Sequence, residues 1–206
     1  MGVYNHNMPQ DSSPLPEEFL SAEFEYIANS AFQANEDRSK IASFFLVSVG
    51  SLVAAILGTQ FLNGTPEKLL IAYRSLAGLF LVLSILGTLT VAQLARLRLA
   101  WHEAAQAMNQ MKDYVADQYQ SVNLKKAFRW RSKTLPKKFK LDSISFYNML
   151  EVSLLCALTF GACVYFSILS LQSTFGLWPI SLGAGGLVFV AQVFLYKVLL
   201  KEKRKP

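Results

Sequence analysis

Residues 75–95 read SLAGLFLVLSILGTLTVAQLA and contain no Asp, Glu, Lys, Arg or His. A helix needs about 20 apolar residues to cross a bilayer core, so this stretch has the length and composition of a transmembrane span. Three further uncharged stretches of this kind occupy residues 41–62, 152–171 and 177–196. A buried core helix of a soluble protein explains one such stretch better than it explains four. The sequence therefore predicts an all-α, polytopic membrane protein with four transmembrane helices.

Charge is segregated along the chain and predicts its orientation. Hydrophobic residues make up 52% of the sequence and charged residues only 17%, and none of the charges lies in the four stretches. Residues 1–40 carry seven acids and two bases, whereas residues 96–140 carry eleven bases and three acids. The positive-inside rule places residues 96–140 and the basic C-terminus in the cytoplasm. We expect two transmembrane hairpins in the cell (inner) membrane, with both termini cytoplasmic.

The same patterns divide the chain into six parts. Residues 1–15 are polar and are expected to be disordered. Pro16 suits the first position of a helix, and we expect an acidic, amphipathic cytoplasmic helix over 16–40. The other four parts are a first transmembrane hairpin at 41–95, a cytoplasmic stalk with a basic segment at 96–147, a second transmembrane hairpin at 148–200 and a basic tail at 201–206.

The second transmembrane stretch has no helix-stop signal at its end. No Gly or Pro occurs from Thr88 to Leu135, and apolar residues recur at steps of three and four as in a coiled coil. We expect the helix to leave the membrane and continue as a stalk to about Val122. Its apolar stripe must be buried against the 16–40 helix, the stalk of a neighbouring subunit or a cytoplasmic protein partner. The predicted interface residues are Leu97, Trp101, Met108, Met111 and Val115.

Residues 124–140 hold eight bases and no acid, interleaved with aromatic residues. Bases next to a membrane are attracted to anionic lipid headgroups by about 1 kcal/mol each. Ordinary positive-inside topology and a specific anionic ligand, lipid or nucleotide, both remain open, whereas nucleic acid is not expected as a partner. The residues predicted to bind anionic lipid are Lys125, Lys126, Arg129, Trp130, Arg131, Lys133, Lys137, Lys138 and Lys140.

Small residues recur every four positions in the first transmembrane stretch, at Gly50, Ala54 and Gly58. Such a face lets two helices approach closely. It predicts either packing within the subunit or an interface between subunits of an oligomer or pore. Cys156 and Cys163 lie seven residues apart on one predicted helix, about 10 Å along its axis, which is too far for a disulfide.

Signals for catalysis are missing from the sequence. The chain has two histidines, far apart, and no metal-ligand spacing, P-loop, dinucleotide fingerprint or nucleophile–base arrangement. We expect no enzymatic activity, no cofactor and no bound metal. Transporters place polar or charged groups at the middle of the membrane. At that depth we expect only Ser, Thr, Cys and Gly in this chain.

The segment that starts at Asn35-Glu-Asp-Arg38 and runs through two transmembrane stretches into the stalk resembles the SLATT class of small prokaryotic membrane domains, over about residues 36–122. That class has two transmembrane helices followed by a long soluble helix. The resemblance implies a pore-forming effector of a nucleotide-activated anti-phage system, which damages the host membrane when triggered. This chain departs from the class in its second helical pair and in having no recognisable nucleotide-binding domain, which implies that a partner protein supplies the trigger.

The sequence favours a non-enzymatic, oligomeric integral membrane protein, in its specific form a pore-forming or membrane-perturbing effector. Two alternatives remain open. The first is a membrane scaffold or lipid-binding adaptor that acts through the basic cytoplasmic segment. The second is a small transporter or integral-membrane enzyme, for which Arg74 and Glu151 are the ionisable residues closest to the edges of the membrane stretches.

Overall fold

The computed structural model describes residues 16–58, 65–118, 126, 128, 130–172 and 176–201. These residues form helices and connecting segments only, which confirms the predicted all-α fold. The elements in chain order are α1 (Pro16–Gly58), α2 (Pro66–Gln118), the short 3₁₀ helix η1 (Ser132–Thr134), α4 (Ile144–Ser170) and α5 (Leu177–Leu199). The region predicted to be disordered, residues 1–15, lies outside the described residues, as does most of the basic tail.

Local sequence explains where these helices begin. α1 and α2 both start at a proline, whose fixed backbone angle and missing N–H suit the first helical position. Ser143 precedes α4, and its hydroxyl accepts a hydrogen bond from the Phe146 N–H at 3.3 Å. Gly176 precedes α5 with a φ of +68°, a left-handed conformation that glycine adopts without strain. The reversal between α4 and α5 therefore ends at Gly176.

Within the described residues, four helices are long and apolar enough to cross a membrane. The prediction of four helices of this kind is confirmed. Their outward faces are apolar as well, which is unusual for a protein surface in water. Examples of exposed side chains, one from each helix, are Phe44 at 76%, Ile71 at 66%, Leu158 at 58% and Val190 at 65%.

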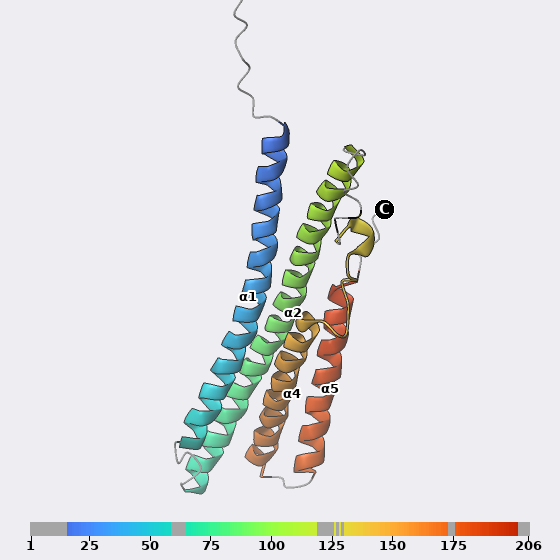
Figure 1. Ribbon diagram of the computed structural model, residues 1–206. Helices are drawn as coiled ribbons and strands as arrows, with labels where there is room; N and C mark the ends of the chain where they lie inside the picture. Colours follow the sequence, from blue (N-terminus) through green and yellow to red (C-terminus); the bar gives the residue numbers. More distant parts are fainter. Residues whose placement is uncertain are drawn as a thin grey trace, which may run out of the picture.

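The four long helices lie alongside one another in a bundle (Figure 1). α2 and α4 form its centre, α1 packs against α2, and α5 packs against α4. α1 and α2 extend well beyond the ends of α4 and α5 at one end of the molecule, which we call the stalk end. α2 continues without interruption to Gln118, and Val122 lies outside the described residues. We call residues 96–118 of α2 the stalk.

Close packing at Gly87 brings three helices together in the core. A Cβ atom at this position would lie 2.8 Å from Cζ of Phe45 in α1 and 2.9 Å from both Cβ and Sγ of Cys156 in α4. Around this point the core is filled by fully buried side chains such as Val91, Leu94 and Val152. The interior of the described bundle is therefore a packed core.

Candidate functional site

Polar side chains of α2 hold the polypeptide segment that follows the stalk. Arg98 donates hydrogen bonds from Nε to the carbonyl oxygen of Lys138 at 3.2 Å and from Nη2 to that of Lys137 at 3.5 Å. One turn further, Nε2 of His102 lies 3.1 Å from the carbonyl oxygen of Pro136, which can only accept, so Nε2 donates. These contacts fold residues 136–138 back along α2.

Arg38 of α1 is buried close to Arg98, with only 5% of its surface exposed. Its Nη2 donates to Oδ1 of Asn35, whereas Nε and Nη1 have no hydrogen-bond partner among the described residues. Burial and the neighbouring Arg98 charge lower the pKa of Arg38, and burial also lowers the pKa of Arg98. No carboxylate in the described part of the chain forms an ion pair with either arginine. We call Arg38 and Arg98 the arginine pair.

A cavity of about 410 Å³ is lined in part by Lys137 and Lys138, whose backbone carbonyl oxygens accept the hydrogen bonds of Arg98. It is lined by the basic residues His102, Lys137 and Lys138, by the amide Gln106 and by apolar side chains that include Leu135 and Leu200. None of the described residues that line it is acidic. We call it the basic cavity. Its lining combines donors for an anion with an apolar wall.

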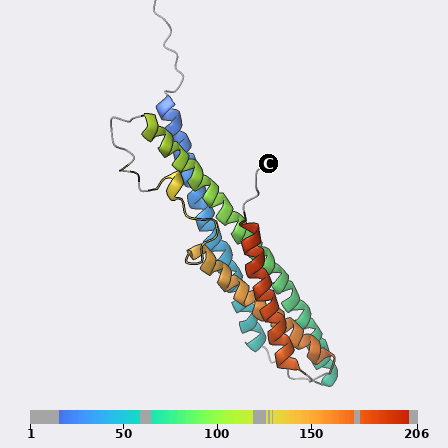
Figure 2. The same cartoon turned by 90° about the vertical axis from the view of Figure 1, so that its right-hand side faces the viewer.

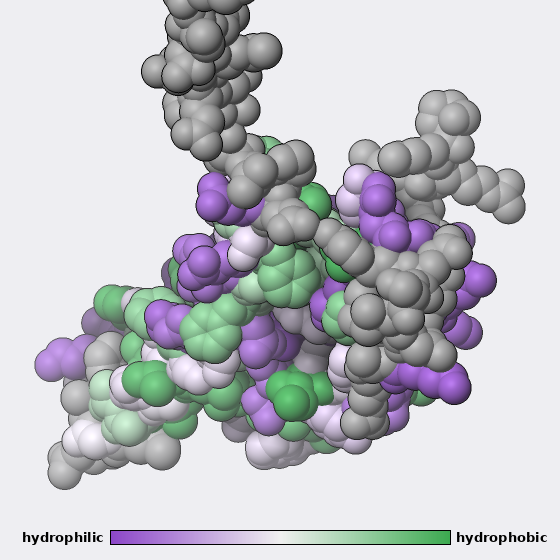
Figure 3. Space-filling view, turned by 45° about the horizontal axis from the view of Figure 1, so that its top comes forward, coloured by the Kyte–Doolittle hydropathy of each residue, from purple (hydrophilic) through white to green (hydrophobic). Residues whose placement is uncertain are grey.

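The predicted lipid-binding segment is thus only partly free. In both side views, the part around η1 lies against the C-terminal half of α2 (Figures 1 and 2). Figure 3 looks obliquely onto the stalk end and shows hydrophilic residues among hydrophobic ones there. The predicted residues that keep exposed side chains are Lys126, Trp130, Lys133, Lys137 and Lys140, whereas Arg131 and Lys138 are half-buried. Lys125 and Arg129 lie outside the described residues.

An ion pair anchors the start of this segment to the stalk. Nε of Arg131 lies 2.6 Å from Oδ1 of Asp113, and the backbone N–H of Ser132 donates to Oδ2 at 3.4 Å. Hydrogen bonding from Ser132, together with Arg131, lowers the pKa of Asp113. Both charged side chains are about one quarter exposed, at 28% and 25%. The anchor therefore depends on an ionised Asp113.

Acidification is expected to release this anchor. A lowered pKa in the folded state means that Asp113 stabilises the docked segment above its unfolded pKa of about 3.9. That contribution disappears as the pH falls through the lower, folded value. Cleavage of residues 130–135 by pepsin should therefore accelerate below about pH 4 in the wild type. Asp113→Asn should be cleaved quickly over the whole acidic range, and a wild-type rate without this pH step would contradict the assignment.

The five predicted stalk residues, Leu97, Trp101, Met108, Met111 and Val115, are all half-buried. The stripe of α2 that is fully buried lies one residue further on and contains Arg98, His102, Ala105 and Asn109. Opposite the stalk lies the first half of α1, where Ala31 and Ala34 are buried, and Nζ of Lys112 lies 5.6 Å from the centre of the Phe24 ring. Residues 16–40 at the start of α1 therefore pack on the stalk within the same chain.

The small residues of α1 face away from the other helices. Gly50, Ala54 and Gly58 are exposed, and a Cβ atom added at either glycine would meet nothing within 4 Å. The opposite side of the same helix is the one that packs in the bundle, through Phe45 and Val49. Among the described residues, this face of α1 therefore does not pack against another helix of the same chain, which was one of the two interpretations of the pattern.

A polar cluster lies inside the bundle at the predicted membrane depth. Nε2 of Gln192 in α5 donates to Oγ1 of Thr88 at 3.0 Å and to Sγ of Cys156 at 2.7 Å, and Cys156 Sγ donates to the carbonyl oxygen of Ser84 at 3.1 Å. Gln192 adds an amide to this cluster, a group that the expectation of Ser, Thr, Cys and Gly at the middle of the membrane did not include. An amide in an otherwise apolar stretch was the available signal. The cluster links α2, α4 and α5, as hydrogen bonds between membrane helices commonly do.

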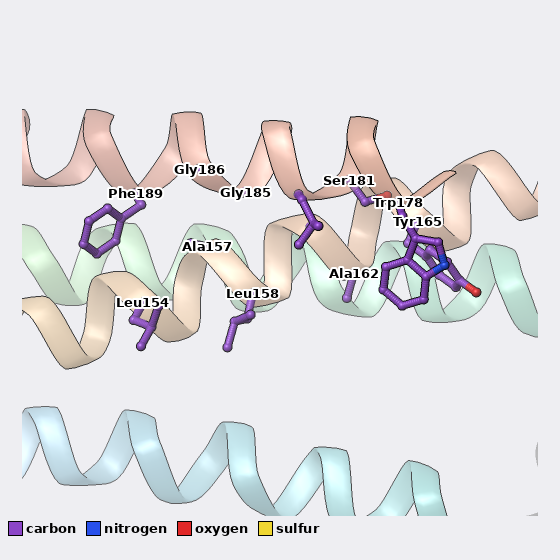
Figure 4. Close-up of a pocket in the computed structure, with 12 residues that line it drawn as sticks. Leu154, Ala157, Leu158, Ala162, Tyr165, Trp178, Ser181, Gly185, Gly186 and Phe189 are labelled. Carbon is purple, nitrogen blue, oxygen red and sulfur yellow. The ribbon is translucent and has the colours of Figure 1, made fainter. Parts of the chain in front are cut away.

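An apolar groove of about 520 Å³ opens between α4 and α5 (Figure 4). Its floor is made of small residues where the helices touch, and a Cβ atom at Gly185 would lie 2.7 Å from the carbonyl oxygen of Ala157. Leu158 of α4 lines one wall, and Tyr165 and Trp178 close one end. The groove faces outward and is almost free of polar groups.

Among the described residues, no three His, Cys, Asp or Glu side chains lie close enough together to hold a metal ion. Arg74 and Glu151 both have exposed side chains. Comparison with protein-family models, with curated proteins and with solved structures finds no match for this chain. The arrangement of the side chains is accordingly the basis for assigning a function.

Proposed function

We propose that the protein is a non-enzymatic integral membrane protein that assembles into an oligomer and perturbs the membrane, with a pore-forming effector as its specific form. The observation that carries this proposal is the exposed small-residue face of α1. Gly50 and Gly58 have nothing within 4 Å of a Cβ atom, so the face is open to a second helix. Small residues at such spacing are a common basis for association of membrane helices.

The placement of two open surfaces favours a ring. α1 and α5 do not contact each other among the described residues, and they lie on opposite sides of the α2–α4 pair (Figure 1). The small-residue face of α1 in one subunit can therefore enter the groove between α4 and α5 of the next. Contacts between two different surfaces generate rings when the rotation closes. Because the described core is packed, a pore would run between subunits.

The orientation that we propose follows from charge. Bases gather at the stalk end, in the segment after α2 and beyond α5, which supports a cytoplasmic position for this end under the positive-inside rule. α1 through α5 would then make two hairpins in the cell (inner) membrane, with both termini in the cytoplasm. The exposed apolar side chains of all four helices would face lipid.

Gly50→Leu is expected to convert the oligomer into monomers and to abolish depolarisation of cells that express the protein. The added side chain fills the open face without touching the subunit's own core, and overpacking of a close helix contact costs about 1–3 kcal/mol. Gly78→Leu is the matched control, because Gly78 is a second exposed glycine with nothing within 4 Å. Size measurement in detergent and a potential-sensitive dye check both outcomes.

Crosslinking separates a ring from a symmetric α1–α1 dimer in the same experiment. In a ring, Ala54→Cys alone should give no crosslink, and Ala54→Cys with Leu158→Cys should give a ladder of oligomers. Both natural cysteines are buried and stay out of the reaction. An oligomer that Gly50→Leu leaves intact, or a wild-type protein that stays monomeric in lipid, would refute the proposal.

A second candidate function, a scaffold or adaptor that binds anionic lipid through the basic segment, is favoured by a different observation. The segment is docked on α2, so its exposed bases, such as Lys133 and Lys137, stand at a defined position near the ends of α4 and α5. Each such base contributes about 1 kcal/mol to attraction by an anionic surface. If each exposed base contributes equally to binding of anionic lipid, the result would support this function and show that the attraction is diffuse.

A further inference from the structure

We infer that the basic cavity is a specific binding site for a phosphate group, held by the cationic side chains that line it. This inference deepens the second candidate function, and it rests on that function where the phosphate belongs to a phospholipid. It does not depend on oligomer formation. A free phosphate compound is the other source of the same chemistry.

The charge of the arginine pair is not compensated by a described carboxylate. Arg38 is 5% exposed and Arg98 is 6% exposed, and no described carboxylate pairs with either. Buried charges in proteins are normally paired, because their desolvation costs several kcal/mol. Arg38 also keeps two N–H groups without a hydrogen-bond partner among the described residues. This part of the molecule therefore favours the arrival of an anion.

Lysine side chains indicate where the anion would bind. Arg98 donates to the carbonyl oxygens of Lys137 and Lys138, and both lysines line the cavity together with His102. Neither arginine is among the lining residues, but Arg98 contacts the backbone of two of them, so its charge adds to that of the lysines near a cavity without an acidic residue in its described lining. A cleft that is lined by charge of one sign concentrates counter-ions.

The size and lining of the cavity favour a phosphate compound as its ligand. A volume of about 410 Å³ falls within the range of small-ligand sites. Lysine and arginine pair strongly with phosphate oxygens through charge-assisted hydrogen bonds. Leu135 and Leu200 add an apolar wall, which suits the glycerol end of a phospholipid headgroup. The cavity lies beside Leu200, just past the end of α5, at the level where headgroups lie in the proposed orientation.

The experiment uses the full chain and measures the melting temperature, Tm, in neutral detergent and in phosphatidylcholine vesicles. Inorganic phosphate is titrated into the first sample, and phosphatidylglycerol is added to the second. Lys137→Gln with Lys138→Gln tests the cavity. Lys133→Gln is the control, because it removes a base from the same segment outside the cavity.

A Tm rise with phosphatidylglycerol only would identify the lipid headgroup as the ligand, and a rise with inorganic phosphate would identify free phosphate as sufficient. The double lysine variant should weaken the interaction roughly 30-fold, since each juxtamembrane base is worth about fivefold. Lys133→Gln should leave it nearly unchanged. No Tm rise with either probe would overturn the site and the lipid-binding function together. An effect of Lys133→Gln of about fivefold, the share of a single base, would overturn the site and leave diffuse lipid binding.

Arg38→Gln provides a readout of opposite sign that does not depend on the lysines. Without phosphate, this variant should melt at or above the wild-type temperature, because it removes a buried charge that lies next to Arg98. Its Tm rise on adding the effective probe should be smaller than that of the wild type. A variant that melts earlier and keeps the full rise would show that Arg38 has only a structural role.

Discussion

Gly185→Ala is expected to separate α4 from α5 and to destabilise the protein by about 3 kcal/mol, the upper end of the usual cost of overpacking. The new Cβ atom would lie 2.7 Å from the carbonyl oxygen of Ala157, 3.4 Å from its carbonyl carbon and 3.8 Å from Cα of Gly161. These are backbone atoms, so no side-chain rotation can relieve the contact. The two helices must move apart as rigid bodies, which also opens the floor of the groove.

Gly186→Ala is the matched control for that prediction. Gly186 is the next residue on α5, and a Cβ atom there meets nothing within 4 Å. Alanine is also the better helix former, so this variant should be as stable as the wild type or slightly more stable. The buried thiols of Cys156 and Cys163 on α4 report the separation through their reaction with a thiol reagent on heating. Equal reactivity of the two variants would contradict the close contact between α4 and α5.

Arg98→Met is expected to release residues 136–140 from α2 and to speed tryptic cleavage at Lys137 and Lys138 by at least roughly tenfold. Arg98 makes two hydrogen bonds to the carbonyl oxygens of these lysines. A hydrogen bond that involves a charged group contributes about 1.5–3 kcal/mol, and a tenfold change needs about 1.4 kcal/mol. Methionine keeps a long, unbranched side chain at the buried position, so the effect should stay local to the segment.

Arg96→Met provides the comparison for Arg98. Arg96 and Arg98 lie two residues apart on α2. Because the side chain of Arg96 is exposed, its substitution should leave the rate of tryptic cleavage unchanged. If Arg98→Met were cleaved at the rate of Arg96→Met, the docking of the segment would have to come from His102 and the Asp113–Arg131 pair alone. The same comparison tests whether the basic cavity is held in shape by Arg98.

Several elements followed directly from the order of residues. Pro16 was predicted to begin a helix, and α1 begins at this residue. The long run of α2 to Gln118 needed only the lack of Gly and Pro after Thr88. These features are local, because neighbours three or four positions away settle a helix terminus.

The buried residues of the candidate site could not be predicted from local sequence in the same way. An a/d pattern marks Leu97 and Trp101 as the stripe to bury, yet Arg98 and His102 occupy the buried position. Arg98 is buried because carbonyl groups of residues 137 and 138, about forty positions away, come to lie against it. Apolar periodicity identifies a face to within about one residue, and it carries no information on which distant backbone will meet that face.

Sequence alone determined that the chain forms four long apolar helices and that its charges gather at one end, because span length and charge segregation are properties of contiguous residues. Tertiary structure decided which groups are left open or uncompensated: the small-residue face of α1, the groove between α4 and α5, and the arginine pair. The physical reason is that exposure and charge balance depend on what packs nearby. Arg38 and Arg98 lie sixty positions apart in the chain and share one buried environment only because α1 and α2 pack side by side.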